Sequence, residues 1–199
     1  PKDRKELNEL TFEDVDALKN ILEGAQSVVP VIERDFDASY KNRRSEVILT
    51  GTRTEYFRLL SLHLKRGGYF SELDNSRYQR VCVIGSDAAR SLFLVEEPLG
   101  KMIKIGEVWF RVVGVLQHHP VSTAGTEQVD LNNHIFAPIN SVNIRFDRER
   151  GESELEQIIV QLKKEVPVVQ SARVIDQILM RRHNQMRIYN LIVPEQLLQ

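Results

Sequence analysis

The residues of this sequence with the clearest capacity for chemistry are three histidines. His118 and His119 are adjacent, and His134 follows them across a polar stretch. Imidazole is a common zinc ligand, and these residues flank one loop between candidate strands, so a zinc site is one hypothesis. Adjacent side chains of an extended segment point to opposite faces, however, and two such neighbours rarely hold one ion. We therefore expect no metal site.

The sequence contains no familiar catalytic or nucleotide-binding motif. Gly100-Lys101 lacks both the glycine loop that precedes a P-loop lysine and the Ser or Thr that follows it. Gly-x-Ser-x-Gly and Cys-x-x-Cys patterns are also missing. The single cysteine, Cys82, stands at an apolar strand-like position and is expected to be a buried, unreactive thiol. We expect no enzyme activity and no cofactor.

Two neighbouring aromatic residues and the adjacent histidines are the candidate contact residues. Trp109 and Phe110 occupy consecutive positions of a predicted strand, so one ring should be in the core and the other exposed. Exposed aromatic rings are frequent anchors of protein interfaces. We take Trp109, His118 and His119 as candidate partner-contact residues.

The elements that must position these residues lie between 78 and 117. Alternating apolar residues predict a strand over 79–85 and a hairpin of strands 101–105 and 108–116. Between them, apolar residues at helical spacing predict a short amphipathic helix over 88–94. Gly106-Glu107 is the predicted hairpin turn. After this module, 118–128 shows no periodicity and predicts a loop, and 133–139 predicts a closing strand.

Helix-and-strand pairs flank this module on both sides. The predicted elements are a helix that Thr11 caps, a hairpin of strands 26–32 and 45–51, a short helix near 52–57, a strand over 155–162, a helix within 166–180 and a last strand over 189–193. Residues 70–76 predict a polar loop. The sequence therefore predicts an α+β fold: a discontinuous helix-and-strand subdomain (1–68 and 141–199) with an inserted β-rich subdomain (69–140).

Composition places the chain among ordinary globular proteins. Apolar residues make up 42% and charged residues 28% of it, and 27 Lys plus Arg against 28 Asp plus Glu give a net charge of −1. This balance argues against a nucleic-acid partner, because such proteins usually carry a basic excess. No apolar run approaches the roughly 20 residues of a membrane-spanning helix. We expect a soluble fragment of a longer protein, since the chain starts at Pro1.

Several of these segments together resemble the periplasmic core domain of MacB-type ABC transporter permeases, the family of macrolide exporters and lipoprotein-release relatives. The similar stretches are Val47–Thr52 with Glu55–Phe57, Arg66–Ser71 with Asp74, Val81–Gly85, Ala88-Ala89 with Leu92-Phe93, Pro98–Lys101, Phe110–Leu116 and Ile178–His183. Their order and spacing cover nearly the whole chain. The stretch 117–129 resembles the family least.

The resemblance implies a porter-like subdomain with an inserted β-rich subdomain, on the periplasmic face of the bacterial inner membrane. It also implies a homodimeric transporter in which the domain transmits ATP-driven conformational change from its own transmembrane and ATPase parts and contacts a periplasmic adaptor or a substrate. We expect the isolated fragment to be a monomer. Two alternatives stay open: a permease-like signalling domain that activates a cell-envelope partner such as a cell-wall hydrolase, and a small metal-dependent hydrolase.

Overall fold

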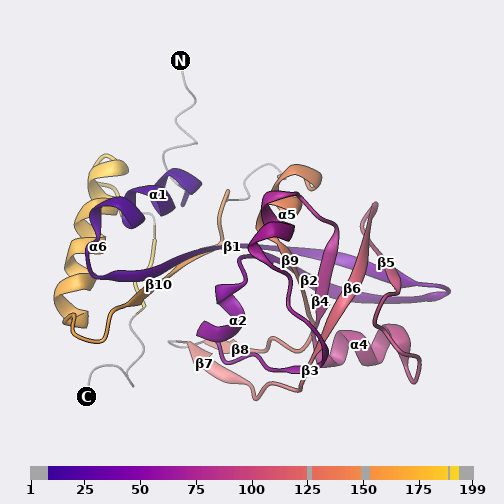
Figure 1. The fold of residues 1–199 in the computed structure, drawn as a ribbon. Coiled ribbons are helices and arrows are strands. Elements are labelled where there is room, and N and C mark those ends of the chain that lie inside the picture. Colours follow the sequence, from indigo (N-terminus) through magenta and orange to yellow (C-terminus); the bar gives the residue numbers. More distant parts are fainter. Residues whose placement is uncertain (1–8, 125–126, 149–152, 188, 193–199) are drawn as a thin grey trace. The chain divides into compact units, whose positions relative to one another are not determined.

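The computed structural model describes residues 9–124, 127–148, 153–187 and 189–192 (Figure 1). Contacts divide the chain into two compact units, which are described separately. Unit 1 draws on Pro1–Pro30, Ala124–Glu127 and Arg148–Gln199, and unit 2 on Val31–Thr123 and Gln128–Asp147. Strand β1 (Ala25–Tyr40) runs from one unit into the other, with its first six residues in unit 1.

Unit 1 pairs two helices with a two-stranded ladder. Its described elements are α1 (Phe12–Ile21), the start of β1, β10 (Gln157–Leu162) and α6 (Val168–Arg182). Strand β10 pairs with β1, and α1 packs on α6. Apolar side chains at helical spacing, among them Leu18 on α1 and Ile175 on α6, are buried, which is why these two helices associate.

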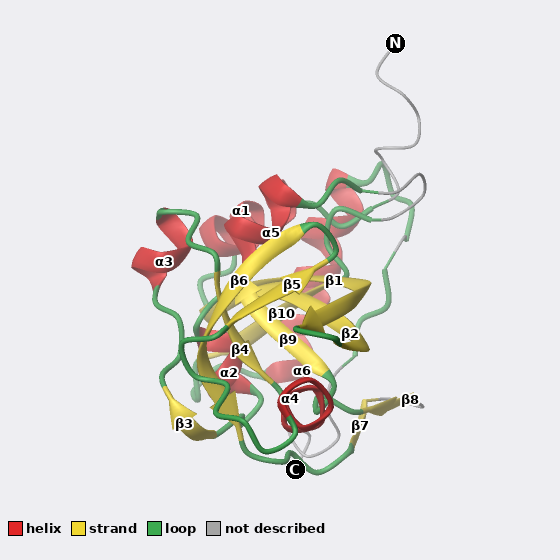
Figure 2. Ribbon diagram, turned by 90° about the vertical axis from the view of Figure 1, so that its right-hand side faces the viewer, coloured by secondary structure: helices red, strands yellow, loops and turns green. Residues whose placement is uncertain are grey.

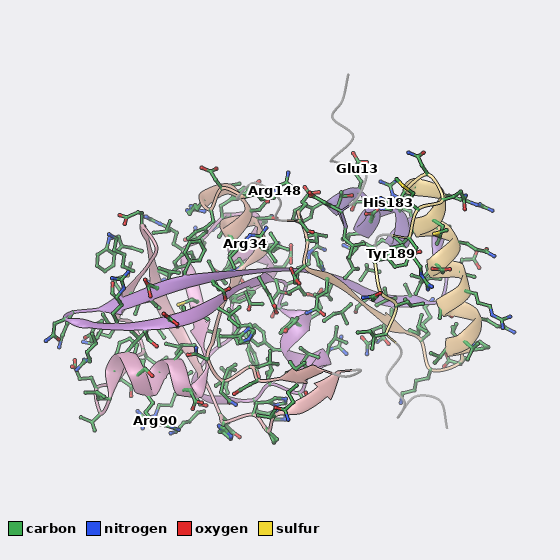
Figure 3. All side chains as sticks on the ribbon, turned by 180° about the vertical axis from the view of Figure 1, so that it is seen from behind. Glu13, Arg34, Arg90, Arg148, His183 and Tyr189 are labelled. Atoms are coloured by element: carbon green, nitrogen blue, oxygen red, sulfur yellow. The ribbon has the colours of Figure 1, made fainter. Side chains whose placement is uncertain are left out.

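A buried carboxylate joins the two helices of unit 1. Asp14 on α1 is fully buried and accepts hydrogen bonds from Arg182 Nε at 2.6 Å and from the backbone NH of Thr11 at 2.9 Å. His183 Nε2 lies 2.9 Å from the same carboxylate. Burial alone raises the pKa of Asp14, but the hydrogen bonds from Arg182, Thr11 and His183 outweigh burial and hold that pKa below its usual value. Figure 3 shows His183 beside α1.

Unit 2 is built on a closed ring of strands (Figure 2). Its main described elements are the rest of β1, β2 (Arg43–Thr52), α2 (Glu55–Leu59), β3 (Leu64–Gly67), α3 (Glu72–Ser76), β4 (Val81–Ile84), α4 (Ser86–Phe93), β5 (Met102–Ile105), β6 (Val108–Leu116), β9 (His134–Pro138) and α5 (Ile139–Arg145). Strand β1 pairs with β2, β2 with β9, β9 with β4, β4 with β6, β6 with β5, and β5 again with β1. The ladder therefore closes into a barrel.

Alternating side chains fill the core of unit 2. Phe110, Ile103 and Leu49 come from three different barrel strands and are fully buried, as strand periodicity requires for one face of each strand. Phe136 and Phe57 pack edge to face with ring centroids 5.5 Å apart. Helix α4 contacts β2 and β6, and α5 contacts β2 and β9, so both helices are fixed on the barrel.

Two glycines bring the short strand β3 close to β6. Gly67 has a φ of 75°, and a Cβ there would lie 2.2 Å from the carbonyl oxygen of Val113. A Cβ on Gly114 would lie 2.2 Å from the carbonyl oxygen of Gly68. Only glycine permits this approach of two backbones. It holds the side chains of β3 near the end of β6.

Many elements expected from the sequence are present. The α+β class is confirmed, and so are the cap of Thr11, in a capping box with Asp14, and the β5–β6 hairpin around Gly106. A β1–β2 hairpin is also present, but residues 32–40 of β1 pair with 43–51, whereas the sequence predicted strand 26–32 as the partner. Phe110 is fully buried while Trp109 is 48% exposed, which confirms the alternation expected for this pair.

Other local predictions were wrong. Residues 72–76 form helix α3, whose capping box of Ser71 and Asp74 was overlooked because the helix has little apolar periodicity. The segment 118–128, expected as a loop, contains β7 (Ser122–Ala124) and the start of β8 (Glu127–Val129), which pair with each other. Leu64–Gly67, where no strand was predicted, forms β3. No strand is present over 189–192, and Val193 lies outside the described residues.

The boundaries of the two predicted subdomains differ from the boundaries of the two compact units. Residues 31–68 lie in unit 2, because the β1–β2 hairpin supplies two strands of the barrel. Strands β4, β5, β6 and β9 supply the others. The division into a porter-like part (1–68, 141–199) and an inserted part (69–140) stays a prediction about functional subdomains. Among the described helices, none has the length and apolar character needed to cross a membrane.

Candidate interaction surfaces

Trp109 lies on the outward face of the β5–β6 hairpin. The register places Trp109 opposite Lys104 and Arg111 opposite Met102. All four side chains alternate with buried neighbours, so they share the outer face of this hairpin. We name these four residues the hairpin patch. An aromatic ring and a thioether between cations can support contact with a protein partner.

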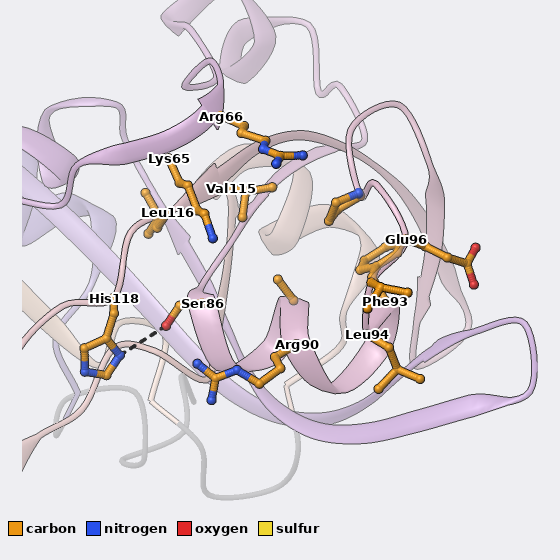
Figure 4. A pocket seen from close by; sticks show the side chains of 13 residues that line it. Lys65, Arg66, Ser86, Arg90, Phe93, Leu94, Glu96, Val115, Leu116 and His118 are labelled. Atoms are coloured by element: carbon orange, nitrogen blue, oxygen red, sulfur yellow. Dashed lines mark hydrogen bonds between the residues drawn. The ribbon is translucent and has the colours of Figure 1, made fainter.

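The two adjacent histidines lie beyond the other end of β6. His118 is exposed, and its Nδ1 is 3.4 Å from the hydroxyl of Ser86 (Figure 4). The Asn132 side chain accepts from the backbone NH of His119 and donates to its carbonyl, both at 2.8 Å. At about 3.3 Å per residue, β6 extends about 23 Å from Trp109 to its last residue, Leu116, so Trp109 and His118 lie near opposite ends of this strand. The predicted contact residues therefore do not form one site.

The third histidine has a structural environment. His134 is buried, and its Nδ1 lies 2.8 Å from the hydroxyl of Thr50. Burial lowers the pKa of His134 to about 4, against the opposing charge of Asp130. Within the described ranges, no three His, Cys, Asp or Glu side chains are placed to hold a metal ion. The three histidines are thus in separate environments.

A groove of about 300 Å³ lies along helix α4 (Figure 4). We name it the α4 groove. Its lining residues are Lys65 and Arg66 of β3, Ser86, Ala89, Arg90 and Phe93 of α4, the turn residues Leu94, Val95, Glu96 and Pro98, and Val115, Leu116 and His118. Of the residues that the sequence singled out, only His118 lines it. The groove combines an apolar floor with cationic walls.

The charged groups around the α4 groove are partly compensated. Arg66 forms an ion pair with Glu97, and Arg90 Nη1 lies 3.4 Å from Asp87 Oδ1. Glu96 accepts hydrogen bonds at 2.6 Å from the side chains of the β1–β2 hairpin, Lys41 and Arg43, and at 3.2 Å from Tyr40. These contacts, chiefly the one with Lys41, lower the pKa of Glu96 to about 2. Glu96 therefore stays ionised at any physiological pH.

The edge of the groove is a turn with an unusual backbone. Leu94 has φ 57° and ψ −102°, and the NH of Glu96 donates to the carbonyl of Phe93 at 2.9 Å. This geometry is that of a type II′ turn, whose first central position favours glycine. Leu94 is 62% exposed and Val95 is 99% exposed. We name these two residues the apolar lip.

Sequence reasoning missed the apolar lip because it extended the predicted helix through Leu94. A signal was nevertheless present. The buried helix positions recur as Ala88, Ala89, Leu92 and Phe93, and Leu94 lies outside that stripe. An apolar residue outside the stripe of a short helix is a candidate for an exposed contact.

Comparison with known proteins identifies relatives of the whole chain. Residues 2–178 match the sequence family described as MacB-like periplasmic core domain. The chain is 29% identical over 191 residues to the pyoverdine export ATP-binding/permease protein PvdT of Pseudomonas aeruginosa, which covers 96% of the chain and 28% of that protein. It is 29% identical over 176 residues to the macrolide export ATP-binding/permease protein MacB of Bdellovibrio bacteriovorus, which covers 87% of the chain and 26% of that protein. The chain thus spans about a quarter of the length of these relatives.

Solved structures show the same fold. The periplasmic region of MacB from Actinobacillus actinomycetemcomitans superposes with a TM-score of 0.76 at 23% identity, over 89% of this chain and 76% of that one. The extracellular domain of the ABC-type transporter YknZ from Gram-positive bacteria also gives a TM-score of 0.76, at 22% identity, over 96% of this chain and 95% of that one. At these identities the two structures show that the chain has the fold of those domains.

Proposed function

The chain belongs to the family of MacB-like periplasmic core domains, and on this premise we propose that it is the extracytoplasmic domain of an ABC transporter permease. In this proposal it transmits ATP-driven conformational change and contacts a periplasmic partner or substrate, as part of a homodimeric transporter at the inner membrane. The single observation that carries the proposal is the match of residues 2–178 to the family. The names of the relatives, which are ATP-binding/permease proteins for export, support it.

The architecture suits mechanical transmission. The barrel of unit 2 closes on itself, so its backbone hydrogen bonds are satisfied within one body and resist bending. In unit 1 the Asp14 contacts tie α1, the first described helix, to the end of α6, the last described helix. A force that reaches α1 or the end of α6 is thereby passed to packed elements. Rigid-body movement of such parts is a common form of coupled conformational change.

The proposal assigns no chemical step to this domain. Cys82, the one thiol of the chain, is fully buried, and burial raises its pKa, so it offers no thiolate. The Ser86 hydroxyl donates to the Asn132 side chain at 3.0 Å and so is engaged in a structural hydrogen bond. The ATPase of the proposed transporter would belong to other parts of the parent protein.

The experiment uses the parent protein in lipid nanodiscs with a spin label at the exposed position Glu107→Cys, in the turn of the β5–β6 hairpin. We expect the distance between the labels of two copies to change when a non-hydrolysable ATP analogue binds. Cys82 serves as the internal control, because its buried thiol should not be labelled. The absence of membrane-spanning segments in the parent protein, or a label distance that nucleotide leaves unchanged, would contradict the proposal.

A further inference from the structure

The charge of the α4 groove favours an anionic ligand group. Its lining contains three basic side chains, Lys65, Arg66 and Arg90, and one carboxylate, Glu96. Figure 4 shows the Glu96 side chain directed away from the groove. This carboxylate accepts hydrogen bonds from Lys41 and Arg43, which do not line the groove. In the part of the chain that the structure describes, no carboxylate lies within ion-pair distance of Lys65. An incoming carboxylate therefore finds an unpaired ammonium group at Lys65, beside Arg66 and Arg90, which pair with Glu97 and Asp87 at the rim.

The apolar lip extends the binding surface beyond the cavity itself. Val95 is almost wholly exposed and Leu94 is mostly exposed, although both are aliphatic. A small molecule confined to about 300 Å³ would leave much of this surface in water. A chain segment that enters the groove and continues past its edge would cover the lip. The apolar surface thus favours a peptide over a small carboxylate.

The turn that carries the apolar lip holds both side chains outward, and its backbone conformation raises the free energy of the folded chain locally. A non-glycine residue with a φ of 57° and a ψ of −102° is strained, and such strain concentrates at sites of function. The backbone NH of Leu94 still donates to the carbonyl of Arg90 at 3.0 Å, so the turn is anchored to α4. The strained geometry therefore belongs to an ordered surface.

The groove is preformed. Leu92 and Phe93 on the inner face of α4 are fully buried, and the Phe93 ring lies 4.4 Å from the ring of Tyr40 on β1. Arg43 Nε donates to the carbonyl of Leu92 at 2.6 Å. These contacts fix α4 on the barrel from both the side chains and the backbone. A ligand would therefore lose little free energy to ordering the site.

From these observations we propose that the α4 groove binds an acidic peptide segment of a partner protein. A carboxylate of the segment pairs with Lys65 and Arg90, and a neighbouring apolar side chain packs against Leu94 and Val95. This inference rests on the proposed function, since it describes the chemistry of the partner contact. It also places that contact at α4, away from the hairpin patch that Trp109 marks.

The test measures peptide binding to the 199-residue chain by fluorescence anisotropy. The probe is a labelled 12-residue peptide that alternates Glu with Leu, and the matched probe replaces each Glu by Gln. We expect the acidic probe to bind at least tenfold more tightly than the neutral one. We expect Lys65→Glu combined with Arg90→Glu to weaken binding of the acidic probe at least tenfold, because two attractive charges become repulsive.

Two further variants test the contribution of the apolar lip to binding and the effect of the overall charge of the chain. Val95→Ser should weaken both probes several-fold, since it removes an apolar contact without altering charge. Arg77→Glu is the charge-reversal control outside the groove, because Arg77 is an exposed cation at the end of α3 that does not line the groove. It should leave both affinities unchanged. Circular dichroism would verify that each variant is folded.

Each remaining outcome overturns the inference. Equal binding of the acidic and neutral probes, or equal loss in Arg77→Glu, would show that the groove does not select a carboxylate. Binding to phosphatidylglycerol vesicles that the double variant abolishes, without peptide binding, would assign the groove to a lipid surface. Binding of N-acetyl-leucyl-glutamate as tight as that of the peptide would assign it to a small carboxylate. If no probe binds while nucleotide still changes the label distance in the parent protein, the inference fails and the proposed function stands.

Discussion

His134 illustrates how one side chain couples the fold of unit 2 to proton concentration. Its imidazole is buried near Phe136 and contacts the hydroxyl of Thr50. Burial favours the neutral ring and lowers the pKa of His134 to about 4 in the folded state. The unfolded chain should return this pKa to about 6.5. Below that pH the unfolded state therefore binds a proton that the folded state excludes.

We predict that unit 2 loses stability as pH falls from about 6.5 to 4. The contribution of His134 is fully present above its unfolded pKa and amounts to about 3 kcal/mol, because each unit of pKa difference corresponds to about 1.4 kcal/mol. Urea unfolding midpoints, followed across this pH range, measure the loss. His134→Gln should flatten the slope, since glutamine does not titrate. His63→Gln, at an exposed position, should keep the slope of the unchanged chain, and an unaltered slope in His134→Gln would refute the account.

At the scale of elements, the turn after α4 sets the shape of the candidate contact surface. Helix α4 ends where Leu94 adopts a positive φ, and the chain reverses toward Pro98. The apolar residues of the helix are buried, whereas those of the turn are exposed. The buried apolar face of α4 and the exposed apolar surface of the following turn, a candidate binding surface, are thus only a few residues apart.

We predict that Leu94→Gly stabilises the chain by about 1 kcal/mol, because glycine adopts this backbone conformation without strain. The exposed leucine side chain gives up little packing in exchange. Thermal or urea unfolding measures the change. Val95→Gly is the matched control: Val95 is exposed but not in a positive-φ conformation, so this substitution should destabilise slightly. A loss of stability in Leu94→Gly equal to that in Val95→Gly would contradict the strain argument.

On the scale of the whole molecule, the division into two compact units bears on whether the chain unfolds in one cooperative step. Unit 1 is held by α1, α6 and the β1–β10 ladder, and unit 2 by the closed barrel. Strand β1 is assigned in part to each unit, and so are the short strands β7 and β8. Local stability is often partitioned among such compact parts of a chain. The units can therefore respond differently to one substitution.

We predict that Asp14→Asn destabilises unit 1 by about 2 kcal/mol, since it weakens charge-assisted hydrogen bonds at a buried site. Hydrogen exchange should accelerate at the amides of α1 and α6 and stay unchanged in β4 and β9. Asp16→Asn, at an exposed position of the same helix, should leave both regions unchanged. Equal acceleration in the barrel would show that the chain unfolds as one cooperative unit.

The sequence predicted those structural features that depend on residues close together in the chain. The capping box at Thr11, the Gly106 hairpin and the alternation of Trp109 and Phe110 involve neighbouring residues, so spacing alone revealed them. The helix α3 and the β7–β8 pair were not predicted, because their sequences lack the apolar periodicity on which the prediction of helices and strands depends. The order and spacing of family-like segments also indicated the family, which the match over 2–178 shows.

The sequence by itself determined the α+β class, the local elements of strong periodicity and the family of this protein. Only the tertiary structure decided that β5 returns to β1 and closes the barrel, because strand partners far apart in the chain are chosen by packing. It also separated Trp109 from His118 and brought Lys65 of β3 to the side of Arg90 on α4. A site assembled from distant segments depends on long-range contacts, which residue spacing does not encode.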